Sequence, residues 1–115
     1  MTQFYGRTFW LGVVTVLATT EATAQSPMLH WGWDSRTMSQ PECVRRAQWA
    51  MGEKGLRVVA ANNSAVAGSG GNVSVLVTCK AEGSETFITV VGASPDSGAA
   101  ERGRNDIRSL VMGPK

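Results

Sequence analysis

Between residues 73 and 80 the chain alternates apolar and polar side chains almost without interruption. Val73, Val75, Val77 and Cys79 hold the odd positions, and three of the four even positions are polar. A period of two is typical of a β-strand with one buried face. We therefore expect Cys79 to lie on the buried face of a strand, together with three valines.

Three further segments have strand character. Residues 56–61 are mostly apolar, and residues 86–91 are a nearly continuous run of β-favouring residues, which predicts a central strand. In segment 25–38, Trp31 and Trp33 lie two residues apart, so they share one face of a short first strand if that segment is extended.

A first helix is indicated by its end signals and its period. Ser39 and Glu42 form the S-x-x-E capping pattern, and Gly55 is a suitable C-terminal stop. The apolar stripe between them consists of Cys43, Val44, Ala47, Ala50 and Met51. This stripe places Cys43 in the first turn, on the buried side.

A second helix is expected near the end of the chain. Ser94-Pro95 supplies a capping residue followed by a proline at the first helical position, and Gly113-Pro114 ends the helix. Its predicted buried stripe consists of Ala100, Gly103, Ile107, Leu110 and Val111.

The glycine-rich segment 67–72 is predicted to be a flexible hairpin loop. A phosphate-binding loop leads from a strand into a helix, whereas a strand follows this segment. The predicted order of elements is thus β-α-β-β-β-α. Because two helices are too few to cover both faces of a sheet, we expect an α+β fold with a small antiparallel sheet of three to four strands and both helices on one face.

The first 24 residues have the features of a secretory signal peptide. Arg7 supplies the positive charge, residues 9–18 the apolar stretch, and residues 22–24 the small side chains that predict cleavage before Gln25. A membrane anchor is the alternative, but this stretch has about half of the ~20 apolar residues that a span needs. We therefore predict a single domain at 25–115 that is secreted or periplasmic, without a stable membrane span after cleavage.

Cys43 and Cys79 are the only cysteines, and both lie in the part predicted to be exported. An even number of cysteines in an oxidising compartment favours a disulfide. The helical stripe and the strand alternation independently place both on the core side. The bridge would close a loop of about 37 residues, worth roughly 3–4 kcal/mol in the chain-entropy estimate. A redox pair is the alternative, but the spacing is not C-x-x-C.

Composition and charge exclude several classes of function. The chain is 43% hydrophobic and 17% charged, which is typical of a globular domain, and its net charge of +2 gives no basis for nucleic-acid binding. One histidine and two cysteines cannot form a closed zinc site without carboxylates, so we expect neither a metal nor a cofactor. On the second helix, Asp106 and Glu101 stand at pairing distance from Arg102 and Arg104, which favours a solvated face.

Tryptophans supply the candidate binding residues. Trp49 lies roughly opposite the apolar stripe of the first helix, one turn after Arg45, and an exposed tryptophan beside an arginine is a typical anchor for a partner. Trp31 and Trp33 form a second candidate patch. The alternative for both is burial, with Trp31 and Trp33 filling the core or folding over Trp49.

Three functional classes fit these observations. The first is a small exported binding or inhibitor-like module, without catalysis, that grips another exported or envelope protein. The second is an envelope accessory or structural protein with a broad docking face and no discrete site. The third is a small hydrolase, which would have to use His30, the only histidine, as its base. We expect the first class, and the pattern leaves the oligomeric state open.

Overall fold

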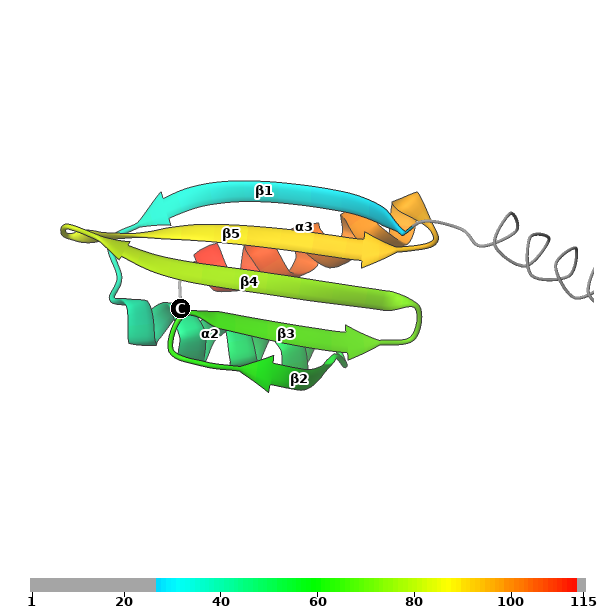
Figure 1. Cartoon of the computed structure of the whole chain (residues 1–115), viewed down its shortest axis with the longest axis horizontal. Helices are drawn as coiled ribbons and strands as arrows, with labels where there is room; N and C mark the ends of the chain where they lie inside the picture. Colours follow the sequence, from blue (N-terminus) through cyan, green and yellow to red (C-terminus); the bar gives the residue numbers. More distant parts are fainter. Residues whose placement is uncertain (1–26, 114–115) are drawn as a thin grey trace, which may run out of the picture.

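A five-stranded antiparallel sheet carries both helices on one face (Figure 1). The computed structural model of the 115-residue chain describes residues 27–113, so the predicted leader at 1–24 lies outside the described part. The elements are β1 (Met28–Arg36), α2 (Gln40–Glu53), β2 (Arg57–Ala61), β3 (Ala65–Gly70), β4 (Val73–Glu82), β5 (Glu85–Ser94) and α3 (Ser97–Met112). Neither of these two helices is long and apolar enough to cross a bilayer.

The strand order is β1-β5-β4-β3-β2, and every neighbouring pair is antiparallel. The α+β class, the antiparallel sheet and the two helices on one face are as predicted. The predicted three to four strands and the order β-α-β-β-β-α are wrong, because β3 is an additional strand. The segment 86–91 lies in β5, an interior strand, while β4 is the middle one.

The missed strand is the glycine-rich segment. Residues 67–70 pair with β4 on one side, residues 67–69 pair with β2 on the other, and the turn shrinks to Gly71 and Asn72. A β-carbon at Gly68 would lie 2.6 Å from the Sδ atom of Met51 on α2. The glycine therefore serves the close packing of a helix on a strand rather than the flexibility of a loop.

Helix α2 begins and ends where the sequence predicts. The Ser39 hydroxyl accepts a hydrogen bond of 3.2 Å from the backbone N–H of Glu42. Gly55 follows the helix with φ +72°, the left-handed conformation that ends many helices at a glycine. Four members of the predicted stripe, Cys43, Ala47, Ala50 and Met51, are buried.

Helix α3 begins later than predicted. Ser94 is the last residue of β5, where it pairs with Met28 of β1, so it does not cap the helix. Asp96 is the cap instead, and its carboxylate accepts a hydrogen bond of 3.0 Å from the N–H of Gly98. The strand extends because β1 offers it a partner to its end.

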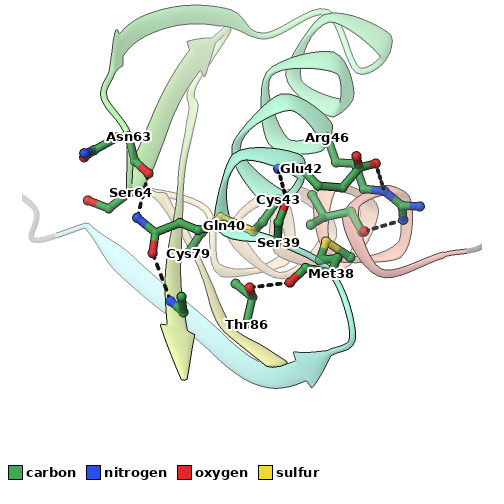
Figure 2. Close-up of a disulfide and its surroundings, with 12 residues drawn as sticks. Met38, Ser39, Gln40, Glu42, Cys43, Arg46, Asn63, Ser64, Cys79 and Thr86 are labelled. Carbon is green, nitrogen blue, oxygen red and sulfur yellow. Dashed lines mark hydrogen bonds and ion pairs between the residues drawn. A yellow bond between two sulfur atoms is a disulfide. The ribbon is translucent and has the colours of Figure 1, made fainter. Parts of the chain in front are cut away.

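The predicted disulfide joins Cys43 in the first turn of α2 to Cys79 in β4, with the two Cα atoms 6.1 Å apart. Gln40 lies beside it and connects the β2–β3 loop to β4: its amide NH2 donates to the carbonyl of Asn63 at 2.8 Å, and its Oε1 accepts from the N–H of Ala81 at 2.9 Å (Figure 2). The hydroxyl of Thr86 donates to the carbonyl of Met38 at 2.6 Å. The start of α2 is thus fixed to the sheet by one covalent bond and several hydrogen bonds.

Candidate binding surface on the open face of the sheet

One face of the sheet carries both helices, and the other face is open. The contacts of β1 show which of its side chains point to each face. His30 lies with its Nε2 atom 2.9 Å from the Ser97 hydroxyl of α3, and Asp34 accepts from Arg108 of α3 at 3.4 Å. The even positions of β1 therefore point to the helices. Because side chains alternate along a strand, Trp31 and Trp33 point to the open face.

Both tryptophans are strongly exposed. The exposed fraction is 62% for Trp31 and 58% for Trp33, with Leu29 at 62% beside them. The Trp33 ring stacks on the ring of Phe87 in β5, with centroids 5.4 Å apart. The alternative that Trp31 and Trp33 fill the core is therefore wrong. The tryptophans gather on one face, as their spacing predicts.

The patch continues across the sheet in two rows of cross-strand neighbours. The first row consists of Trp31, Val91, Leu76, Ala67 and Ala60. The second row consists of Trp33, Thr89, Thr78 and Ala65. Leu76 is 40% exposed in the middle strand. We call these nine residues, together with Leu29 and Phe87, the open sheet face.

The two rows carry no ionisable side chain, and the charged side chains on the same side of the sheet stand beside them: Lys80 is the cross-strand partner of Phe87, and Arg57 is the partner of Ser69. The nearest charges on β4 stand toward its hairpin end, where Lys80 pairs with Glu82 at 3.7 Å. On β2, Arg57 lies at the first position of the strand. An exposed apolar area of several hundred Å² that is rimmed by polar residues is typical of a protein interaction site.

The outer edge of β1 is protected against the addition of a further strand. The carbonyl of Trp31 accepts from Arg104 at 2.9 Å, and the carbonyl of Ser35 accepts from Arg36 at 3.0 Å. The N–H of Ser35 donates to the carboxylate of Asp34 at 2.8 Å. The opposite edge strand, β2, is short and has a bulge between Val58 and Ala60. Such features discourage edge-to-edge pairing and leave the face as the means of contact.

The other predicted binding pair lies in the helix layer. Trp49 is 53% exposed on α2, and Arg45 forms an ion pair of 2.7 Å with Glu42. Since α2 covers the face opposite to Trp31 and Trp33, the structure does not bring the two candidate sites together (Figure 1). The alternative that Trp31 and Trp33 fold over Trp49 is wrong for the same reason.

Sequence reasoning missed Ser97 as the partner of His30. The two side chains form a serine–histidine contact at the start of α3. In a serine hydrolase a third group orients the histidine. Within residues 27–113, no carboxylate contacts the His30 ring, so this pair lacks the third member. The contact connects β1 to the helix layer.

Two hollows lie elsewhere on the molecule. One of about 300 Å³ is bounded by the end of α2, the β3–β4 turn and α3, and it is lined in part by Lys54 and Arg102. The predicted pairing of Arg102 with Asp106 is not formed, since neither of these side chains has a partner in the described part. The other hollow, of about 540 Å³, lies between the loop before α2 and the β4–β5 hairpin. The described residues contain no group of three or more potential metal ligands.

Leu76, Phe87 and Val91 were not singled out from the sequence as surface residues. A signal for them was present, because Leu76 interrupts the polar positions of 73–80, and segment 86–91 is apolar on both of its faces.

Compared with models of known protein families and with curated protein sequences, the chain matches none.

Proposed function

We propose that this chain is an exported, non-catalytic binding module that engages a partner protein through the open sheet face, with Trp31 and Trp33 as anchors. The observation that carries the proposal is the joint exposure of these two tryptophans, 62% and 58%, next to Leu29 and Leu76. Tryptophan is enriched among the residues that dominate binding energy in protein interfaces.

The lack of charge in the two rows supports a protein partner over a charged polymer. Nucleic acids and anionic membranes are held by clustered Lys and Arg side chains, which the two rows lack. The hydroxyls of Thr78 and Thr89 are the only side-chain hydrogen-bonding groups in the rows apart from the indole N–H groups. A largely apolar protein surface is the complement that such a face requires.

Export is supported by the leader pattern and by the disulfide. The Cys43–Cys79 bridge is of the kind that persists in oxidising compartments. Expression of the full 115-residue chain should yield an exported protein whose mass corresponds to a start at Gln25 with both cysteines oxidised. A product that retains its first 24 residues inside the cell would contradict this part of the proposal.

Capture from the exporting cell's envelope fraction tests the binding surface. The wild type is compared with a Trp31→Ser/Trp33→Ser variant and with Trp49→Ser, a matched control that removes an exposed tryptophan from the helix layer. We expect the double variant to lose capture at least about tenfold while Trp49→Ser retains it, because anchor residues typically contribute 2 kcal/mol or more. Melting curves of the wild type and both variants test that the fold is kept.

The single variants separate the two binding classes. A discrete anchor predicts that Trp31→Ser or Trp33→Ser alone removes most of the capture. A broad docking face without a discrete site, the accessory or structural alternative, predicts small losses at each position. Capture that depends on Trp49 and is independent of Trp31 and Trp33 would contradict the proposed surface.

A further inference from the structure

We infer that the partner on the open sheet face is a second copy of this chain, so that two sheets pack face to face as a symmetric dimer. This inference rests on the proposed function, because it uses the same surface. It follows from the shape of that surface, from the lack of charge in its two rows and from its area.

The open sheet face is graded in height. In the first row the tallest side chain is Trp31 on β1, Val91 and Leu76 are intermediate, and the alanines on β3 and β2 are the lowest. In the second row the side chains shorten from Trp33, through two threonines, to Ala65 on β3. Along these two rows the face is therefore tall at β1 and low at β3 and β2. A flat partner that touched the tryptophans would leave a gap over the alanines.

A copy of the same face fills that gap. A two-fold axis that runs parallel to the strands, midway between two facing sheets, places β1 of each copy over β3 and β2 of the other. The tall edge of each then lies over the low edge of its partner, and the middle strand β4 lies near the axis in both copies. Facing sheets pack about 10 Å apart with strands within about 30° of each other. The contact is isologous, as in most dimers.

The distribution of charge favours a copy over a charged partner. Two copies with a net charge of +2 repel each other weakly, but the rows that would come together contain no charged side chain. Complementary charges usually steer a protein onto its partner and fix the register of an interface. The two rows offer none, so the shape of their side chains would have to set the register.

The area of the face suits a dimer. A strand spacing of about 4.8 Å and a rise of about 3.3 Å per residue give the 40 residues of the five strands roughly 600 Å² in projection. The accessible area exceeds the projection, because bulky side chains stand out from the sheet. A standard interface buries about 800 Å² on each partner. Contact over the whole face, with Lys80 and Arg57 at its ends, therefore approaches the size of a stable interface.

Sedimentation of the purified exported protein over a range of concentrations tests the inference. The wild type should sediment at twice the mass of the chain. Trp31→Lys should weaken the dimer at least about tenfold, because it places a like charge from each copy in an apolar contact. Leu76→Lys, on the middle strand, should do the same through a second position. Trp49→Lys adds the same charge to the helix layer and should leave the dimer intact.

Cross-linking tests the predicted axis. The chain has only two cysteines, and both are in the disulfide, so an added cysteine is a unique thiol. Thr78→Cys lies on the middle strand near the axis and should cross-link to its copy through a short bifunctional maleimide. Gln48→Cys, exposed on the helix layer, is the control and should not.

Each outcome decides between the two proposals. A wild type that stays monomeric up to about 100 μM, above the dissociation constants of specific complexes, overturns the dimer. In that case, loss of envelope capture by Trp31→Ser/Trp33→Ser still supports the binding surface with a different protein as partner. A dimer that survives both Trp31→Lys and Leu76→Lys overturns this interface. Failure of Thr78→Cys to cross-link in a dimer overturns the axis.

Discussion

The backbone of Gly92 in β5 lies directly against the carbonyl oxygen of Ala100 in α3. A β-carbon at position 92 would overlap that oxygen and would lie 3.1 Å from the backbone nitrogen of Arg104. The contact is between main chains, so no flexible side chain can move aside. The distance of α3 from the sheet is thus set by the absence of a side chain at Gly92.

Gly92→Ala should therefore lower the free energy of unfolding by at least about 2 kcal/mol, as overpacked cores commonly do. Urea unfolding measures the loss. The matched control is Gly52→Ala in α2, where a β-carbon would meet nothing within 4 Å. Alanine is favoured over glycine inside a helix by about 0.5–1 kcal/mol, so this control should gain stability. Equal effects at the two positions would contradict the close packing.

The disulfide is expected to contribute a large part of the stability of so small a domain. Removing both cysteines in Cys43→Ala/Cys79→Ala should cost about 3–4 kcal/mol, because the unfolded chain regains the freedom of a loop of about 37 residues. Unfolding in urea measures the cost. Dithiothreitol should destabilise the wild type by a similar amount and leave the double variant unchanged. A double variant as stable as the wild type would show that the bridge contributes nothing to the free energy of unfolding.

The fold class was predictable because two periodic patterns agreed. The stripe with Cys43 and the alternation with Cys79 each pointed their cysteine inward, and a single bridge satisfies both. Strand β3 was not predictable from local pattern. Gly68 and Gly70 have low strand propensity, and what makes their segment a strand is Met51 and Leu56 packing where side chains would otherwise stand.

The candidate site was predictable in part. The spacing of Trp31 and Trp33 places them on one face, but the hydrophobic pattern alone assigns that face to the core. In β1 the assignment is reversed, because the inward positions His30 and Asp34 meet polar groups on α3. Only the tertiary position of α3 decides this. A strand whose polar side chains find partners under a helix is free to expose its apolar ones.

Asp34 is the centre of a small surface network that this reversal creates. Its carboxylate lies 3.1 Å from Arg36 and 3.4 Å from Arg108, and its side chain is about one-third exposed. Exposed ion pairs contribute about 0–1 kcal/mol and weaken in salt. Asp34→Asn should therefore cost less than about 1 kcal/mol in urea unfolding, with the difference shrinking near 1 M salt. Glu101→Gln, which removes an exposed carboxylate from α3, is the control. A large, salt-independent loss would contradict this account.

Arg46 connects the two helices more strongly. Its Nη1 atom donates to the carbonyls of Val111 at 3.1 Å and Gly113 at 2.8 Å, at the end of α3, and its side chain is only 18% exposed. The last carbonyls of a helix have no partner within the helix, so Arg46 satisfies groups that would otherwise need water or another cap. The guanidinium also lies 3.4 Å from Glu42, which keeps its charge paired.

Arg46→Met retains the apolar stem and removes the hydrogen bonds, so we expect a loss of about 1.5–3 kcal/mol. Arg45→Met is the matched control on the preceding residue, since Arg45 is mostly exposed and, among residues 27–113, pairs only with Glu42. It should cost less than about 1 kcal/mol. Hydrogen exchange should localise the effect of Arg46→Met to the last turn of α3. Equal losses in the two variants, or unchanged protection of residues 109–113, would contradict the role of Arg46 as the cap of α3.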